Sequence, residues 1–240
     1  MKSKLIKALI AAAMPTSGLR CAAYRALLGY DIPASARIGF GTLIAIRSLK
    51  VGERTTIGPF NIFKGPIDAK IGADAKIGRS NMFSSAWHIL DERFKEWNYE
   101  PRLVLADRTL VLNKHFFDVY GLVEIGEGSW IAGYNGEFWT HGLSTMDRDI
   151  VIGRNCYIGS SVKFAPGSRI GDSNIVALGS VVFSKLDVSD QLISGFPAKP
   201  IRSIAEDRAA GKYRFTFEDW IERTSDHAIG PKHRELRVHP

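Results

Sequence analysis

Cysteine is scarce in this chain of 240 residues, with Cys21 and Cys156 as its two thiols. Two cysteines give no sign of a disulfide framework or a cysteine-based metal site, and such a chain suits a reducing compartment. Near the N-terminus no apolar run is long enough to span a bilayer, because Lys7 interrupts the stretch LIKALIAAAM. The length and a hydrophobic fraction of 45% predict one folded domain with short appendages.

The chain also lacks a recognition-helix motif and any strip of interleaved aromatic and basic residues, so we expect no nucleic-acid partner. Its formal net charge is nevertheless +7. This excess is either a solvated basic surface or a sign of an anionic partner, such as a phosphate-bearing cofactor, a phosphate-linked substrate or an anionic membrane.

Residues 152–187 repeat every six positions and divide into IGRNCY, IGSSVK, FAPGSR, IGDSNI, VALGSV and VFSKLD. An aliphatic or aromatic residue opens each block, Gly or Ala usually follows it, and a small or modest side chain usually stands fifth. This period fits neither one helix face nor one alternating strand. It is typical of a parallel β-helix whose coils have three short flat faces.

Each block is expected to form one short strand and one corner. The opening residue should point inward and stack on its equivalent one coil away, at about 4.8 Å. The small fifth residue should also face inward, and the Gly or Ala should lie near the corner, where glycine tolerates unusual backbone angles. We therefore predict an all-β solenoid, a left-handed parallel β-helix with short N- and C-terminal helices, whose stacked coils bury one continuous apolar column.

The same pattern appears earlier with interruptions, so the predicted β-helix domain covers residues 36–203. Residues 84–104 and 137–151 carry no such blocks and are predicted to be inserted loops, and the register shifts over 117–124. Binding and catalytic residues tend to lie on loops held by a rigid scaffold. The breaks in the repeat therefore indicate where a site should be sought.

Residues 1–35 are predicted to form two helices broken near Pro15. These helices either cap the open end of the solenoid or rest on a membrane surface. Residues 204–240 are predicted to form short helices and a polar tail, to which we assign no chemistry.

The repeats, followed by the string Gly195-Phe196-Pro197-Ala198-Lys199, resemble the hexapeptide-repeat acyltransferases, and most closely those that O-acetylate sugars and polysaccharides. The resemblance covers about residues 36–204. It implies a homotrimer with active sites between adjacent solenoids and acetyl-CoA as cosubstrate. It further implies direct attack of an acceptor hydroxyl on the thioester, with a loop histidine as base. We expect no metal, and a cytoplasmic protein, peripheral to the inner face of the membrane if the N-terminal helices bind lipid.

The resemblance makes His141 the general base, because it lies in the loop 137–151 where related sugar acetyltransferases carry their catalytic histidine. A sugar hydroxyl is a poor nucleophile until its proton is taken, and a neutral imidazole can take it near pH 7. His115 is a second candidate, either as an acceptor-binding or activating group or as a buried structural histidine. Asp118 or Glu137 could orient an imidazole through its second nitrogen.

Coenzyme A needs backbone partners for its pantetheine arm and cations for its phosphates. Trp139 could form an apolar wall for pantetheine or stack on a sugar ring. By resemblance, Ser160 and Leu178 would supply backbone contacts, and Ser184, Lys185, Lys199 and Arg202 would lie near the phosphate and adenine end. For Trp139 and for each carboxylate a structural role is an equal alternative, and for each cation the alternative is a solvated charge.

Two other readings of the repeat remain open. A γ-carbonic-anhydrase-like zinc enzyme needs three histidine ligands, for which His88, His115 and His141 are available, but the close histidine pair of that family is absent. A non-enzymatic scaffold would use the β-helix as a rigid spacer. The acceptor itself, a small-molecule or lipid-linked sugar of a bacterial surface polysaccharide, is an expectation drawn from the resemblance.

Overall fold

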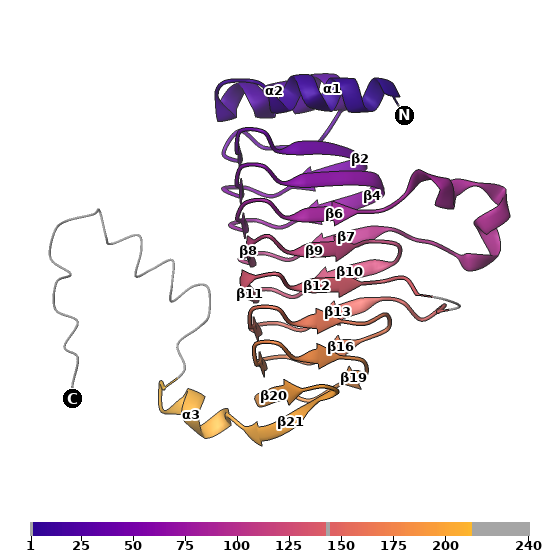
Figure 1. Ribbon diagram of the computed structural model, residues 1–240. Helices are drawn as coiled ribbons and strands as arrows, with labels where there is room; N and C mark the ends of the chain where they lie inside the picture. Colours follow the sequence, from indigo (N-terminus) through magenta and orange to yellow (C-terminus); the bar gives the residue numbers. More distant parts are fainter. Residues whose placement is uncertain (1, 143–144, 213–240) are drawn as a thin grey trace, which may run out of the picture.

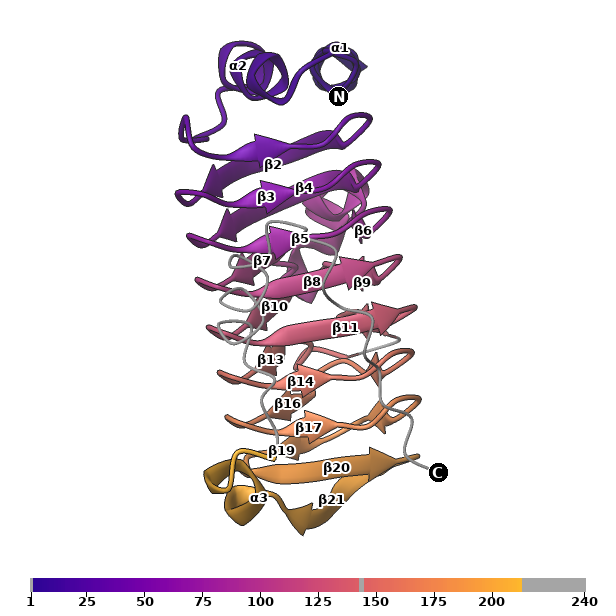
Figure 2. The ribbon, with the colours of Figure 1, turned by 90° about the vertical axis from the view of Figure 1, so that its left-hand side faces the viewer.

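The computed structural model describes residues 2–142 and 145–212. Its centre is a tall stack of coils built from short strands (Figures 1 and 2). The first face of each coil contains β6 (Met82–Ser84), β9 (Phe116–Asp118), β12 (Glu137–Trp139), β15 (Lys163–Phe164) and β18 (Val181–Val182). The second face contains β7 (Arg102–Leu105), β10 (Leu122–Ile125), β13 (Ile150–Ile152), β16 (Arg169–Ile170) and β19 (Lys185–Leu186).

The third face holds β1 (Arg37–Ile38), β3 (Thr56–Ile57), β5 (Lys76–Ile77), β8 (Leu110–Asn113), β11 (Trp130–Tyr134), β14 (Tyr157–Ile158), β17 (Ile175–Val176), β20 (Gln191–Gly195) and β21 (Ala198–Ser203). Two long strands, β2 (Leu43–Val51) and β4 (Ile62–Ile71), run across both the first and the second face. Each strand pairs in parallel with its equivalent on the next coil, except that β21 returns antiparallel to β20. The predicted parallel β-helix is confirmed.

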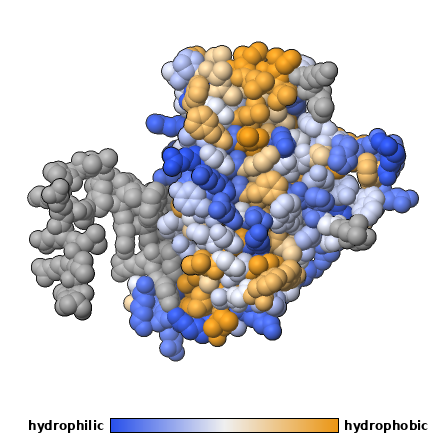
Figure 3. All heavy atoms as spheres, viewed as in Figure 1, coloured by the Kyte–Doolittle hydropathy of each residue, from blue (hydrophilic) through white to orange (hydrophobic). Residues whose placement is uncertain are grey.

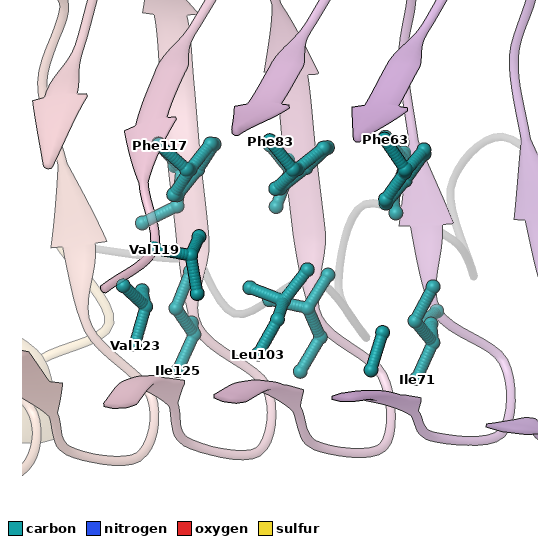
Figure 4. Close-up of a cluster of buried hydrophobic side chains, with 14 of the residues drawn as sticks. Phe63, Ile71, Phe83, Leu103, Phe117, Val119, Val123 and Ile125 are labelled. Atoms are coloured by element: carbon teal, nitrogen blue, oxygen red, sulfur yellow. The ribbon is translucent and has the colours of Figure 1, made fainter. Parts of the chain in front are cut away.

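The interior is a set of columns formed by residues in register on successive coils. On the first face a phenylalanine column runs through Phe63, Phe83, Phe117, Phe138 and Phe164, with ring centroids 4.3 to 5.1 Å apart and nearly parallel planes. Figure 4 shows part of this column beside the aliphatic residues of the second face. The spacing matches the distance between neighbouring strands, so each ring fills one coil.

The six-residue pattern is realised as predicted. The opening residues of the blocks from 152 onward are 0–1% exposed: Ile152, Ile158, Phe164, Ile170, Val176 and Val182. The fifth positions also face inward, and Cys156 is 1% exposed. At the corners the coils approach closely, since a Cβ added to Gly58 would lie 2.3 Å from the carbonyl oxygen of Gly78.

Two helices, α1 (Lys2–Ala12) and α2 (Ser17–Leu28), lie across the first coil (Figure 1). Thr16 caps α2 by accepting a hydrogen bond from the amide of Leu19, and Gly29 ends it with a left-handed φ of 70°. Tyr24 of α2 attaches the helices to the first coil, because its buried hydroxyl donates to the carbonyl of Thr42 at 2.6 Å. No helix of the described residues is long and apolar enough to cross a membrane.

Both inserted loops are shorter than the sequence suggested. The first contains the 3₁₀ helices η1 (Trp87–Leu90) and η2 (Glu92–Trp97) and covers residues 85–101, while the second covers 140–149. Their predicted ends at 84, 102–104, 137–139 and 150–151 are strand residues, because they pair with neighbouring coils. Helix α3 (Ala205–Ala209) follows the solenoid, and the rest of the predicted tail, residues 213–240, lies outside the described residues.

Candidate active site

Both inserted loops leave the β-helix at the same corner. The connections from the first face to the second face run through residues 85–101, 119–121, 140–149, 165–168 and 183–184 on successive coils, and we call this edge the loop corner. Loop 85–101 leaves one coil before residues 119–121, and loop 140–149 leaves one coil after them. Figure 1 shows both loops projecting from the same side of the stack. Parallel stacking of the coils therefore brings together residues 85–101, 119–121 and 140–149, which are far apart in the sequence.

The carboxylate of Asp118 and the imidazole of His141 meet at this corner. Asp118 ends β9 and is 4% exposed. Its Oδ2 lies 2.7 Å from His141 Nδ1 and accepts the backbone amide of His141 at 3.1 Å. The His141 side chain is 42% exposed. Nδ1 therefore carries the hydrogen when Asp118 is ionised, and Nε2 carries a lone pair on an accessible ring.

Burial raises the pKa of Asp118, and the hydrogen bond and charge interaction with His141 oppose that shift. The backbone around the pair is fixed by Thr140, which is fully buried. Its hydroxyl donates to the carbonyl of Asp118 and accepts the amides of Tyr120 at 2.7 Å and Gly121 at 3.2 Å. The register pairs Trp139 with Asp118. Thr140 and His141, which follow Trp139, therefore lie directly beside the carboxylate.

Aromatic rings from the two neighbouring segments pack around the imidazole. The ring of Tyr120 lies 4.3 Å from that of His141, and Tyr99 packs edge-on against Tyr120 at 5.5 Å. Arg148, which is 4% exposed, places its guanidinium 4.4 Å from the centre of the Tyr99 ring and donates to the carbonyl of Trp97 at 2.7 Å. This buried cation joins loop 140–149 to loop 85–101.

Glu137 does not reach the imidazole. Its carboxylate accepts hydrogen bonds from Lys163 at 2.9 Å and from the indole of Trp139 at 3.0 Å. Desolvation acts to raise the pKa of Glu137, but these two partners outweigh it and the pKa is lowered. Trp139 in turn packs on Phe116 with ring centres 4.9 Å apart and is 37% exposed. Of the two carboxylates proposed to orient an imidazole, Asp118 is the one in contact.

His115 lies inside the β-helix at the corner between the third and the first face. It is 1% exposed, its Nδ1 accepts the amide of Gly136 at 2.9 Å, and its own amide donates to Asn81 at 2.8 Å. Burial lowers its pKa to about 4. Asp118 follows it by three positions along the strand, a distance of about 10 Å. This placement favours the structural alternative for His115.

Apart from Trp139, the predicted coenzyme A residues fall in three places. Ser160 and Leu178 occupy equivalent positions on adjacent coils at the corner between the third and the first face, and Leu178 is 79% exposed. Ser184 and Lys185 lie at the loop corner, where Lys185 pairs with Asp147 at 2.7 Å. Lys199 and Arg202 lie on β21, and Arg202 pairs with Asp207 at 2.8 Å. The first two pairs flank opposite edges of the first face, and the third pair lies at the C-terminal end.

Four residues not predicted from the sequence belong to the two side-chain clusters, around His141 and around Glu137: Tyr99, Tyr120, Arg148 and Lys163. The signal available for Tyr99, Tyr120 and Arg148 was their position in breaks of the repeat, whereas Lys163 stands in a regular block and nothing marked it. A surface charge and a buried charge look alike in sequence, so nothing marked Arg148 as a contact between loops. In the described ranges no three His, Cys, Asp or Glu side chains cluster as a metal site would require.

Comparison with known proteins bears on the fold. No family model matches the chain. A stretch of 67 residues is 39% identical to the Saccharomyces cerevisiae protein named "Putative acetyltransferase YJL218W", and this match spans 27% of the chain but only 33% of that protein. A solved hexapeptide transferase family protein from Anaplasma phagocytophilum superimposes with a TM-score of 0.50 at 16% identity, over 82% of this chain and 92% of that one. The chain has the hexapeptide-repeat β-helix fold.

The predicted left-handed β-helix of hexapeptide repeats is thereby confirmed, together with its short terminal helices. A weaker likeness, with a TM-score of 0.39 and 14% identity over 84% of each chain, is to a maltose O-acetyltransferase from Clostridium difficile 630. A shared fold does not by itself assign an activity.

Proposed function

We propose that this protein is an acyl-CoA-dependent O-acyltransferase, most specifically an acetyl-CoA-dependent enzyme that acetylates a sugar hydroxyl. The observation that carries the proposal is the contact between buried Asp118 and half-exposed His141 at the loop corner. A buried carboxylate fixes the imidazole with one nitrogen facing outward, which is the arrangement a general base requires.

In the proposed reaction, Nε2 of His141 takes the proton of the acceptor hydroxyl while the oxygen attacks the thioester carbonyl. The C–S bond then breaks, and the imidazolium returns its proton to the departing sulfur. Asp118 stabilises the imidazolium and holds Nδ1–H in place. The products are the acyl ester and free coenzyme A, and no covalent enzyme intermediate is needed.

The donor would lie along the first face, toward the C-terminal end of the solenoid. Exposed apolar surface there suits a pantetheine arm and an adenine ring, since Leu178 is 79% exposed, Phe196 is 75% exposed and Phe183 is 50% exposed. Lys199 on β21 is exposed and suits a phosphate. Lys185 and Arg202 already pair with carboxylates, so phosphate contacts through them would replace existing ion pairs. We expect a homotrimer, in which a neighbouring solenoid completes the donor cleft.

The test is thiol release from acetyl-CoA with a panel of sugar acceptors, for wild type and His141→Gln, with coenzyme A binding measured by calorimetry. We expect the variant to bind coenzyme A normally and to lose roughly a hundredfold or more of the transfer rate. Unchanged rates in the variant would overturn the role of His141. If neither coenzyme A binding nor thiol release can be detected, the acyltransferase proposal fails. That result would support the alternative of a non-enzymatic scaffold.

A further inference from the structure

Helix α1 turns its small residues toward the protein and its large aliphatic residues toward solvent. Ala8 and Ala11 are fully buried. The outer face of α1 consists of four side chains that are 45%, 58%, 52% and 48% exposed: Leu5, Ile6, Leu9 and Ile10. A helix that served only as a cap would bury its large residues. Figure 3 shows hydrophobic side chains gathered over the N-terminal helices, and such patches mark interaction surfaces.

The N-terminal helices carry basic residues and no acidic ones. Residues 1–30 contain Lys2, Lys4, Lys7, Arg20 and Arg25 and neither Asp nor Glu. Lys7 and Arg25 are exposed, whereas Arg20 is 6% exposed and donates to the carbonyls of Ile38 and Met14. An amphipathic helix with aliphatic residues on one face and basic residues beside them suits the surface of an anionic bilayer. A second copy of the same helix would bring like charges together, which disfavours self-association through this face.

A groove of 520 Å³ extends from α1 to Tyr120, whose ring packs on His141. It is lined by residues of α1, of loop 85–101 and of the first face: Lys4, Leu5, Ala45, Lys64, Gly65, Ser84, Ser85, Ala86, Trp87 and Tyr120. Ala45, Gly65, Ser85 and Tyr120 belong to four successive coils, so the groove extends over about 14 Å. At its far end the Tyr120 ring lies 4.3 Å from that of His141.

The lining suits a sugar that carries a phosphate. Trp87 and Tyr120 are half-buried rings on which a sugar can stack, and the exposed ammonium of Lys64 can pair with an anion. Leu5 belongs both to the groove and to the outer face of α1. The mouth of the groove is therefore continuous with the surface that fits a bilayer.

We propose that the outer face of α1 docks on an anionic lipid surface and that the groove receives the polar head of a lipid-linked sugar, with its hydroxyl at His141. The chemistry of this step rests on the proposed function, whereas the docking does not. The acceptor would then be modified while its lipid remains in the bilayer.

The test uses the full chain with vesicles of phosphatidylcholine alone, and of phosphatidylcholine with about 30% phosphatidylglycerol. The variant is Ile6→Glu combined with Ile10→Glu, and the control is Ile201→Glu, which changes an equally exposed isoleucine (60%) on β21. We expect wild type and control to co-sediment with the anionic vesicles, and the double variant to bind roughly tenfold or more weakly because it removes apolar contact and adds repulsion.

Both native cysteines are buried, so a polarity-sensitive dye can be attached to Ile6→Cys or Ile201→Cys. The emission should shift to the blue with anionic vesicles for position 6 and stay unchanged for position 201. The proposal would be overturned if wild type did not bind the anionic vesicles, or if the double variant bound them as tightly as wild type. If wild type does not bind vesicles but sediments as a larger species than the double variant, the outer face of α1 is an interface with a second copy of the chain instead.

The groove is tested separately with a galactosyl polyprenyl phosphate in the anionic vesicles and galactose 1-phosphate in solution, following thiol release from acetyl-CoA. We expect faster release with the vesicle-bound glycolipid, a loss of that advantage in the double variant, and slower release with both acceptors in Trp87→Ala. Equal rates for both acceptors in wild type would overturn the lipid-linked acceptor. Calorimetry with coenzyme A on the same proteins distinguishes the two failures. If coenzyme A binds while both acceptors react equally, the lipid-linked acceptor is wrong, and if coenzyme A does not bind, the proposed function is wrong.

Discussion

Oδ2 of Asp118 receives two contacts from His141, one from ring Nδ1 at 2.7 Å and one from the backbone amide at 3.1 Å. The residues are 23 positions apart and belong to adjacent coils. The double contact fixes both the position of the loop and the orientation of the ring, as the proposed role of His141 requires.

Replacing Asp118 by Asn should lower the transfer rate by roughly 10- to 100-fold, as expected for loss of a group that orients a functional histidine. The amide cannot stabilise the imidazolium and can favour the wrong tautomer. The pH dependence of kcat should change with it, which a merely structural role would not produce. Asp31→Asn, at an exposed ion pair with Lys50, is the matched control and should keep the wild-type profile.

His115 should make the fold sensitive to acid. Burial lowers its pKa from 6.5 to about 4, so the folded state favours the neutral ring. Its contribution to stability is present above pH 6.5 and is lost as the pH falls toward 4, up to roughly 3 kcal/mol. His115→Asn, which places in this corner the residue type found at Asn81 one coil earlier, should reduce the loss. Urea unfolding at pH 7.5, 5.5 and 4.5 measures the difference, and parallel curves for the two proteins would contradict it.

Arg148 should hold the two loops together. Arg148→Ala removes its hydrogen bond to the carbonyl of Trp97 and its stacking on Tyr99, which should cost loop 85–101 about 1–3 kcal/mol of local stability. Limited proteolysis should cut this loop faster, and the transfer rate should fall because Tyr120 loses its support. Arg93→Ala in the same loop removes a side chain that is 79% exposed and should leave both readouts near wild type. Equal cleavage of the two variants would contradict the role of Arg148.

Phe83→Ala should destabilise the β-helix strongly. The ring is fully buried between Phe63 and Phe117, with centroids at 4.3 and 4.5 Å. Truncation leaves a cavity in the phenylalanine column, and the expected loss in the free energy of unfolding is about 3–5 kcal/mol. Phe40→Ala, at a ring that is 52% exposed, should cost far less in the same denaturation experiment. A similar loss in both variants would show that the column carries no special share of the stability.

The sequence by itself determined the repeating frame. A period of six fixed the inward positions, including Cys156, and the breaks in that period predicted two loops, one of which carries His141. These features follow from local rules, because the opening position of every block meets its own equivalent one coil away. The ends of the loops were placed less well, since Glu137 and Ile150 take part in strand pairing that no local pattern reveals.

Only the tertiary structure decided which groups meet. Asp118 and Glu137 were equal candidates in sequence, yet coil-to-coil register sets Trp139 beside Asp118 and leaves Glu137 with Lys163. The groove beneath α1 and the contact between Arg148 and Tyr99 likewise join segments whose separation along the chain has no fixed period. A repeat encodes contacts between equivalent positions, whereas a site at a corner depends on how insertions of different length fold back on their neighbours.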